Sequence, residues 1–186
     1  MNNNNNNIYN LPNILTICRI LIVPVIFALL FFKKEIYELY AALFFVLAMG
    51  TDFIDGYIAR KRNIVTTLGT FLDPIADKIL VVTILIMLIP LNRIPAWMVV
   101  IIIIREIFIT GLRAIAGEKG LVIPAGKIGK WKTSFQMFGI LFLLIYYTHF
   151  YINFGVVGYW VILFSILLSI YSSYKYFIGA SEIILN

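Results

Sequence analysis

The aspartates are the residues of this chain whose type and spacing point most directly to chemistry. The sequence has four, and all lie in one stretch, at Asp52, Asp55, Asp73 and Asp77. Helical spacings of three and four place each pair on one helix face. Four carboxylates this close stay charged only beside cations, and hard divalent ions such as Mg²⁺ commonly bridge carboxylates to substrate phosphates. The pattern favours a two-metal site that activates an attacking oxygen and stabilises a leaving oxygen on phosphorus.

Three further residues in the same stretch fit such a site. Gly56 and Gly69 lack a Cβ, which allows a ligand or another backbone to approach closely. Arg60 follows Gly56 by one turn and can offer two parallel N–H donors to a phosphate. Plainer alternatives stay open: tight helix packing for the glycines, anchoring at the membrane surface for Arg60, and a structural ion-pair network or a transporter's proton relay for the aspartates.

The composition indicates a membrane protein. Hydrophobic residues make up 62% of the 186 positions and charged residues 13%, where soluble domains have roughly 45–50% and about 25%. A soluble all-α protein with a large core is the alternative, but it would have to hide many long apolar runs. The net charge of +6 is interpreted as membrane topology plus binding of anionic ligands, so no nucleic-acid partner is expected.

Apolar segments of the length that crosses a bilayer, about 20 residues, occur six times. They predict an all-α integral membrane protein with six transmembrane helices and a polar active-site cavity at the cytoplasmic side. Residues 1–10 are expected to form a disordered, Asn-rich tract, residues 11–180 a single catalytic domain, and residues 181–186 a tail. The expected spans are residues 12–32, 37–59, 67–89, 95–116, 132–149 and 156–178.

The distribution of Lys and Arg between the spans predicts the orientation. One set of connections holds eight cations and the other holds three, and cytoplasmic loops carry the excess of Lys and Arg. Both termini and the aspartates are therefore expected on the cytoplasmic side. The eight are Arg60, Lys61, Arg62, Arg113, Lys119, Lys127, Lys130 and Lys132, and the three are Lys33, Lys34 and Arg93.

The spacing of the site residues matches a known signature. The residues read D-x₂-D-G-x₂-A-R-x₈-G-x₃-D-x₃-D, which resembles the CDP-alcohol phosphotransferase family. Members are six-helix membrane enzymes that transfer a phosphatidyl-type group from a CDP-linked lipid to an alcohol and release CMP. The matching positions are Asp52, Asp55, Gly56, Ala59, Arg60, Gly69, Asp73 and Asp77.

The resemblance implies a role for each of these positions. Asp52, Asp55 and Asp73 would hold two divalent ions, Mg²⁺ or Mn²⁺. Asp77 would help to bind the second ion and act as general base on the acceptor hydroxyl. The CDP moiety would lie against Gly56, Arg60 and Gly69. A homodimer in the lipid bilayer is also implied.

Other stretches indicate which alcohol accepts the group. "LPNILTICRILIVP", "LDPIADKIL", "REIFITGLRAIAGEKG" and "IPAGKIGKWKTSFQM" resemble the bacterial branch of the family that moves a phosphatidyl group from CDP-diacylglycerol to sn-glycerol 3-phosphate. That branch acts in the inner (plasma) membrane, in phospholipid biosynthesis. Another acceptor within the family, as in a cardiolipin synthase of the CDP-diacylglycerol type, stays open, as does a small ion-coupled transporter.

A glycerol 3-phosphate acceptor would need a cationic pocket. Arg105 and Arg113 are eight residues apart on the fourth expected span, or about 12 Å along a helix axis. Lys127 and Lys130 are three apart and can share a helix face. The alternatives are a structural ion pair of Arg105 with the adjacent Glu106 or with an aspartate, and simple anchoring at the cytoplasmic membrane face for the lysines, including Lys132.

The first expected span carries a polar stripe. Asn13, Thr16 and Arg19 recur every three residues in an otherwise apolar run, so they share one helix face. The stripe resembles one that recurs in the family, which would place Asn13 and Thr16 at the nucleotide cleft. Hydrogen bonds between helices are the alternative function of these side chains.

Overall fold

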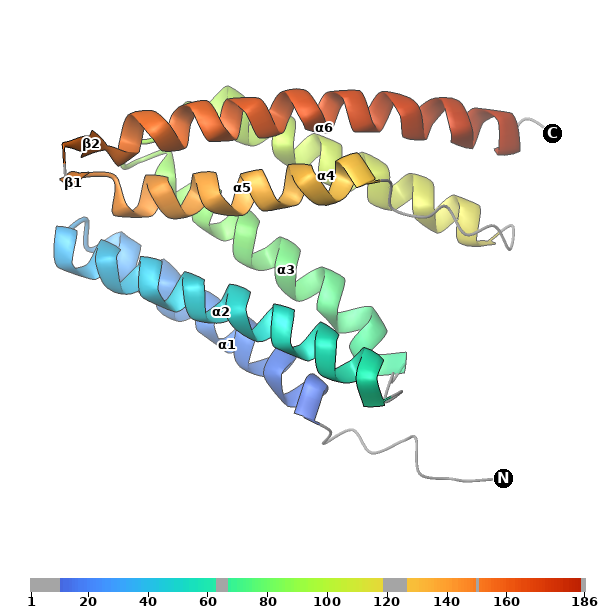
Figure 1. Ribbon diagram of the computed structural model, residues 1–186, viewed down its shortest axis with the longest axis horizontal. Helices are drawn as coiled ribbons and strands as arrows, with labels where there is room; N and C mark the ends of the chain where they lie inside the picture. Colours follow the sequence, from blue (N-terminus) through green and yellow to red (C-terminus); the bar gives the residue numbers. More distant parts are fainter. Residues whose placement is uncertain (1–10, 63–66, 119–126, 150, 185–186) are drawn as a thin grey trace. The chain divides into compact units, whose positions relative to one another are not determined.

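The computed structural model describes the backbone of residues 11–62, 67–118, 127–149 and 151–184, and the side chains of residues 14–51, 72–117, 129, 131–147 and 151–178. The described residues form six helices and one short hairpin (Figure 1). They belong to two compact units, Met1–Met87 and Leu88–Asn186. The elements are α1 (Leu11–Phe31), α2 (Glu35–Arg62), α3 (Thr67–Leu88), α4 (Ala96–Glu118), α5 (Lys127–Ile145), β1 (Thr148–His149), β2 (Ile152–Asn153) and α6 (Phe154–Ile184).

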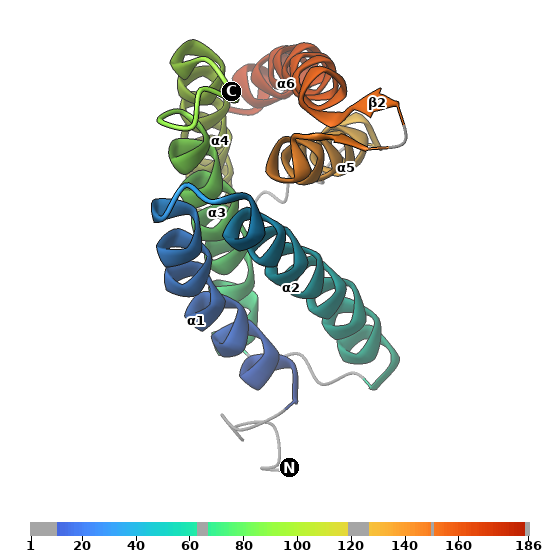
Figure 2. The same ribbon diagram turned by 90° about the vertical axis from the view of Figure 1, so that its left-hand side faces the viewer.

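In the first unit, α1 and α2 lie side by side, as both ribbon views show (Figures 1 and 2). The turn between them is short, and Lys33 adopts a left-handed conformation there, with φ of 51°. Ile26 and Leu30 of α1 and Phe45 of α2 are fully buried. Burying apolar side chains of this size stabilises the pair by about 1.5–3 kcal/mol each relative to water exposure.

In the second unit, α5 and α6 form an antiparallel pair joined by the β1–β2 hairpin (Figure 1). Two glycines allow the helices to approach closely. A Cβ on Gly139 would lie 2.7 Å from Ile162 Cγ1, and one on Gly158 would lie 2.9 Å from the backbone nitrogen of Leu143. Small residues have this role at helix interfaces in membranes. Helix α4 packs against α6.

Arg93, in the turn that precedes α4, caps the end of α5. Its NH1 donates to the carbonyl oxygens of Leu143 and Leu144, both at 2.9 Å. Its guanidinium carbon lies 4.4 Å from the centre of the Tyr146 ring. The last carbonyls of a helix lack partners within the helix and carry a partial negative charge, so a buried cation satisfies both requirements.

The ends of the last two helices differ from the expected spans. Helix α5 ends at Ile145 and not at residue 149, because Tyr146 takes a left-handed conformation with φ of 54° and the hairpin follows. Helix α6 begins at Phe154, where the side chain of Asn153 accepts a hydrogen bond from the Val156 amide, as an N-cap does. It continues to Ile184, into the segment expected to be a tail.

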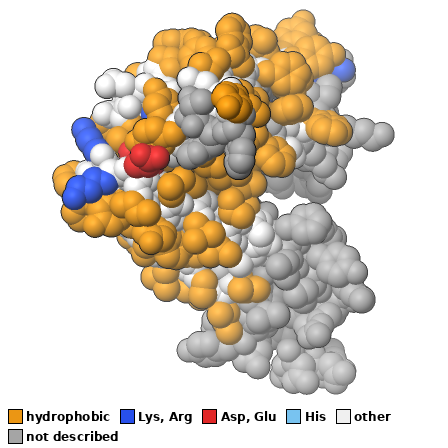
Figure 3. All heavy atoms as spheres, turned by 60° about the vertical axis from the view of Figure 1, so that its left-hand side comes forward, with side chains coloured by type: hydrophobic (Ala, Val, Ile, Leu, Met, Phe, Trp, Pro, Cys, Tyr) orange, Lys and Arg blue, Asp and Glu red, His pale blue; other side chains and the backbone are white. Residues whose placement is uncertain are grey.

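The surface of the described residues is largely apolar, as the face in Figure 3 shows. Large side chains such as Leu21, Ile107 and Trp160 are more than half exposed. Within the described residues, two helices are long and apolar enough to cross a bilayer, over Ile14–Phe31 and Phe154–Ile178. Exposed apolar area of this extent marks contact with lipid or protein. The finding supports an all-helical membrane protein, whereas the arrangement in six spans remains a prediction.

Candidate active site

The two aspartates of α3 that the structure describes, Asp73 and Asp77, are hydrogen-bonded to the polar stripe of α1. Thr16 Oγ1 donates to Asp73 Oδ1 at 2.5 Å. Arg19 NH1 donates to Asp77 Oδ1 at 2.9 Å, forming an ion pair. The hydrogen-bonding interpretation of the stripe is thus confirmed for Thr16 and Arg19, and a nucleotide contact by Thr16 stays a prediction.

The spacing of the residues explains the pairing. Thr16 and Arg19 are three apart on α1, while Asp73 and Asp77 are four apart on α3, so each helix presents both partners on one face. Arg19 is only 1% exposed, and a buried guanidinium is tolerated only when it is paired and hydrogen-bonded. The carboxylates of α3 therefore hold α1 and α3 together, and α1 fixes their direction.

The observed bonds are compatible with a metal site at Asp73 and Asp77. Both bonds use the Oδ1 atoms, and an ionised carboxylate has two oxygens with about four lone-pair sites. Oxygen ligands of this kind are what Mg²⁺ and Mn²⁺ prefer. The described side chains include no group of three or more potential metal ligands, and Asp73 and Asp77 are half of the expected set of four.

The remaining signature residues are placed on helices, but their side chains lie outside the described residues. Asp52, Asp55, Gly56 and Arg60 belong to α2, near its carboxyl end, and Gly69 belongs to the first turn of α3. The side chain of Asn13, in the first turn of α1, also lies outside the described residues. Their roles in binding metal and nucleotide stay predictions.

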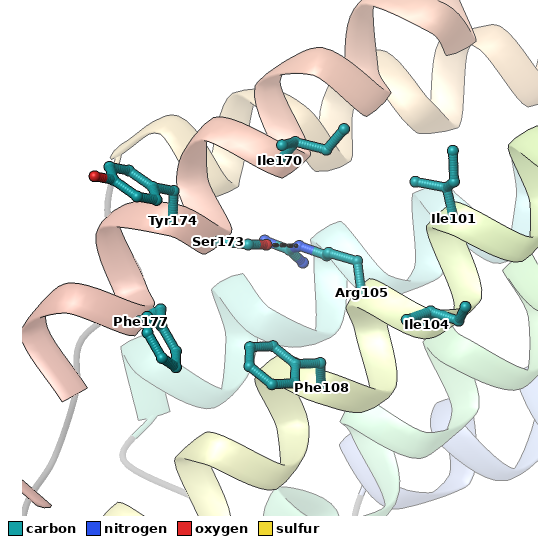
Figure 4. A pocket seen from close by; sticks show the side chains of 8 residues that line it. All are labelled: Ile101, Ile104, Arg105, Phe108, Ile170, Ser173, Tyr174 and Phe177. Carbon is teal, nitrogen blue, oxygen red and sulfur yellow. Dashed lines mark hydrogen bonds between the residues drawn. The ribbon is translucent and has the colours of Figure 1, made fainter. Parts of the chain in front are cut away.

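In the second unit, Glu106 joins two cations. Its Oε1 accepts a hydrogen bond from Arg105 NH1 at 3.0 Å and another from Lys132 Nζ. Arg105 Nε also donates to Ser173 Oγ at 3.0 Å (Figure 4). These bonds link α4 to both α5 and α6. The alternative for Arg105, an ion pair with Glu106, is thus confirmed, and phosphate binding by Arg105 stays a prediction.

The structure gives Lys132 a partner that sequence reasoning did not identify. Anchoring at the membrane face was one alternative for this lysine, but Lys132 is only 3% exposed and its ammonium is bonded to Glu106. The available signal was its position in an apolar helix, in a half of the chain that has few acidic residues. A lysine there requires a buried carboxylate, and Glu106 was the candidate.

The other candidates for an acceptor pocket are only partly described. Arg113 NH2 donates to the hydroxyl of Tyr176 at 2.9 Å, and the guanidinium carbon lies 5.3 Å from the centre of that ring. Lys127 and Lys130 lie in the first turn of α5, with side chains outside the described residues. The structure therefore brings Arg105 and Lys132 together, and Arg113 lies two turns further along α4.

An open groove of about 490 Å³ runs between α4 and α6 (Figure 4). Its walls are apolar apart from Arg105 and Ser173, and the expected polar cavity at the cytoplasmic side remains a prediction. Arg105 contributes to the groove and reaches across it to Ser173. The lining residues are Ile101, Ile104, Arg105, Phe108, Ile170, Ser173, Tyr174 and Phe177.

Comparison with known proteins decides the family. The family model for CDP-alcohol phosphatidyltransferase matches residues 9–171. The chain belongs to this family. The match includes all four aspartates, the polar stripe of α1 and the Arg105–Glu106–Lys132 cluster. Membership among the CDP-alcohol phosphatidyltransferases favours a transferase over the alternative of a small ion-coupled transporter.

Individual relatives within the family share one activity name, CDP-diacylglycerol–glycerol-3-phosphate 3-phosphatidyltransferase. The protein of Bacillus subtilis is 39% identical over 150 residues, covering 74% of this chain and 78% of its own length. That of Rickettsia typhi is 43% identical over 136 residues, covering 73% and 76%. That of Wigglesworthia glossinidia brevipalpis is 39% identical over 173 residues, covering 90% and 93%.

Proposed function

We propose that this chain transfers a phosphatidyl group from CDP-diacylglycerol to sn-glycerol 3-phosphate, producing phosphatidylglycerophosphate and CMP for phospholipid biosynthesis. The observation that carries the proposal is the shared name of relatives that are 39–43% identical over most of the chain. The aspartate signature supplies the chemistry. The position of Thr16 and Arg19 against Asp73 and Asp77 supports a preorganised site, because it fixes two of the four carboxylates.

In the proposed reaction, the C1 hydroxyl oxygen of the acceptor attacks the phosphorus of the phosphatidyl group. The bond from that phosphorus to the bridging oxygen breaks, and CMP leaves with the electron pair. Asp77 takes the proton of the attacking hydroxyl. The sequence gives no Ser–His or Cys–His pair that would support a covalent intermediate, so direct displacement is the proposed route.

The metal-binding role is assigned to Asp52, Asp55, Asp73 and Asp77, which would hold two Mg²⁺ or Mn²⁺ ions. Bound divalent ions would neutralise the diphosphate and make CMP a better leaving group. Arg60 would donate to the diphosphate, while Gly56 and Gly69 leave room for the nucleotide. Arg19 holds Asp77 in a fixed orientation, which suits a general base that must meet a hydroxyl in one geometry.

Binding of the acceptor's phosphate is assigned to cationic side chains of the second unit. Arg105 and Arg113 of α4 would bind it together with Lys127 and Lys130 at the start of α5. A dianion in a weakly polar environment requires cations, and arginine offers planar donor pairs that match phosphate oxygens. The nucleotide would extend along the α1 stripe at Asn13 and Thr16.

The proposed setting is the inner (plasma) membrane, with six spans and with both termini and the active site on the cytoplasmic side. The apolar surface supports a bilayer environment, and the distribution of Lys and Arg supports the orientation. The acyl chains of the donor would stay in the bilayer while its diphosphate reaches the aspartates. A homodimer is proposed from the family resemblance.

The acceptor is tested by CMP release from purified protein in detergent with CDP-diacylglycerol and Mg²⁺. Glycerol 3-phosphate, glycerol, serine, inositol and phosphatidylglycerol are compared as acceptors. We expect release with glycerol 3-phosphate and phosphatidylglycerophosphate as the lipid product. Release with phosphatidylglycerol instead would keep the family and replace the acceptor, giving a cardiolipin synthase.

A further inference from the structure

We propose that Ser173 and Glu106 are positioning residues that hold the Arg105 guanidinium in one orientation, so that it binds a phosphate group of a substrate. The inference rests on the proposed function and deepens it, because neither Ser173 nor Glu106 has a role in the reaction as described above. Both act through Arg105, in a cluster of four hydrogen bonds formed by residues of α4, α5 and α6.

Arg105 is held on two of its three nitrogens. NH1 donates to Glu106 Oε1 at 3.0 Å and Nε donates to Ser173 Oγ at 3.0 Å. A guanidinium has five N–H donors in a rigid plane, so these two bonds fix the plane and leave three donors, two on NH2 and one on NH1. The described residues provide no hydrogen bond to NH2 of Arg105. A held guanidinium with a remaining donor pair is suited to a phosphate oxygen.

The hydroxyl of Ser173 is itself oriented. It donates to the carbonyl oxygen of Ser169, one turn earlier on α6, at 2.8 Å. Its proton is thereby committed to the helix backbone, and its lone pairs accept the Nε–H of Arg105. The two bonds therefore form a chain in which Arg105 donates to Ser173 and Ser173 donates to the backbone of α6. A mobile hydroxyl would not fix the guanidinium in this way.

The charges of the cluster favour an anionic ligand. Arg105 and Lys132 are two cations that share the carboxylate of Glu106. Residues 88–186 contain eight Lys and Arg and three Glu, so this half of the chain is strongly basic. Among the side chains described in it, Glu106 is the single carboxylate, and it lies where it directs Arg105. Fixing a charged group before the ligand arrives lowers the entropic cost of binding.

Two substrates of the proposed reaction carry phosphate, the soluble acceptor and the lipid donor. The chemistry at Arg105 is the same for both, namely a bidentate contact to phosphate oxygens. We expect the acceptor, because it needs a cationic site that the aspartates do not provide. Separate KM values for glycerol 3-phosphate and CDP-diacylglycerol distinguish the two sources.

The test is Ser173→Ala, with Ser165→Ala as the matched control. Ser165 is also on α6 and is buried, and its hydroxyl donates to the carbonyl oxygen of Ile162, but it makes no bond to Arg105. We expect Ser173→Ala to raise the KM for glycerol 3-phosphate about three- to tenfold, the range for one lost hydrogen bond. We expect unchanged kcat, and unchanged values for both parameters in Ser165→Ala.

A double-mutant cycle separates positioning from a general loss of structure. Arg105→Lys keeps the charge but removes the fork that Ser173 and Glu106 hold. If Ser173 acts through Arg105, adding Ser173→Ala to Arg105→Lys has no further effect on KM. By itself, Glu106→Gln is expected to raise the KM for glycerol 3-phosphate about tenfold, because hydrogen bonds to a charged carboxylate are stronger. Added to Arg105→Lys, it should likewise have no further effect on this KM.

The outcomes are distinct. A change in the KM for CDP-diacylglycerol instead would keep the role of Arg105 and assign it to the lipid phosphate. Equal effects of Ser173→Ala and Ser165→Ala, or additive effects with Arg105→Lys, would overturn the inference. If the wild-type protein does not use glycerol 3-phosphate, the proposed function is wrong, and the inference about Ser173 and Glu106 needs a separate test. The same variants are then compared by their stabilisation with inorganic phosphate, and loss of stabilisation in Ser173→Ala alone would still support the inference.

Discussion

Replacing Arg93 with methionine is expected to destabilise the second unit strongly without changing substrate affinity. Arg93 is 6% exposed, and its NH1 donates to two carbonyl oxygens at the end of α5. Methionine fills much of the same space but donates no hydrogen bond. The carbonyls of Leu143 and Leu144 would each lose a charged donor, and the Tyr146 ring would lose the cation above it.

The magnitude follows from these contacts. Two hydrogen bonds from a charged donor contribute roughly 3–6 kcal/mol, and the cation above Tyr146 adds about 0.5–1 kcal/mol. Ordering the long side chain of Arg93 costs about 2 kcal/mol of rotamer entropy. Together the three terms give about 1.5–5 kcal/mol, so the free energy of unfolding should fall by about 3 kcal/mol, the middle of this combined range. For a chain of this size that corresponds to a decrease in Tm of about 6–12 °C.

The assay is thermal unfolding of purified protein in detergent, followed by circular dichroism. Lys175→Met is the matched control, because Lys175 is an exposed cation that lies 4.9 Å from the centre of the Tyr171 ring. Its Tm should stay within about 2 °C of the wild type, since exposed cation–ring contacts contribute little. A Tm for Arg93→Met within the same margin would refute the assignment of Arg93 as the cap of α5.

The remaining predictions concern helix packing and the aspartates. Gly158→Ala should lower the free energy of unfolding by about 1–3 kcal/mol through overpacking, because the new methyl group would meet the Leu143 backbone. Gly111→Ala is the control and should be neutral or stabilising, since nothing lies within 4 Å of its Cβ position. Thr16→Val should lower kcat about tenfold or more with little loss of helix content, because Asp73 loses the hydrogen bond from Thr16. An unchanged kcat would show that Thr16 has only a structural role. Arg19→Met should lower kcat by a similar factor, and Arg19→Lys should restore part of it, since only a cation can pair with Asp77.

Helix number and most helix starts could be predicted from the sequence because long apolar runs dominate the chain. The expected span of residues 67–89 corresponds to α3, which covers Thr67–Leu88. The end of α5 could not be predicted, because the left-handed Tyr146 and the two-residue strands beyond it give no hydropathy signal. A run of aromatic and β-branched residues there continues the apolar pattern beyond the helix.

The candidate site was predictable to different degrees in its two parts. The spacing of the aspartates pointed to a shared helix face, and the α1 stripe pointed to a polar partner, but the sequence could not tell that Thr16 and Arg19 pair with Asp73 and Asp77. The burial of Lys132 was missed because its sequence neighbours look like those of an anchoring lysine. Its partner, Glu106, lies on another helix, and such pairings depend on packing that one-dimensional patterns do not specify.

The central claim is that the aspartates form a metal-dependent site for transfer to glycerol 3-phosphate. It is tested most directly by measuring phosphatidylglycerophosphate and CMP together during a Mg²⁺ titration of wild-type protein and Asp77→Asn. The account predicts equal amounts of the two products, no turnover with EDTA, and a loss of at least about 100-fold in the variant, the lower range for a general base. Turnover that persists in EDTA, or near wild-type turnover by folded Asp77→Asn, would contradict it.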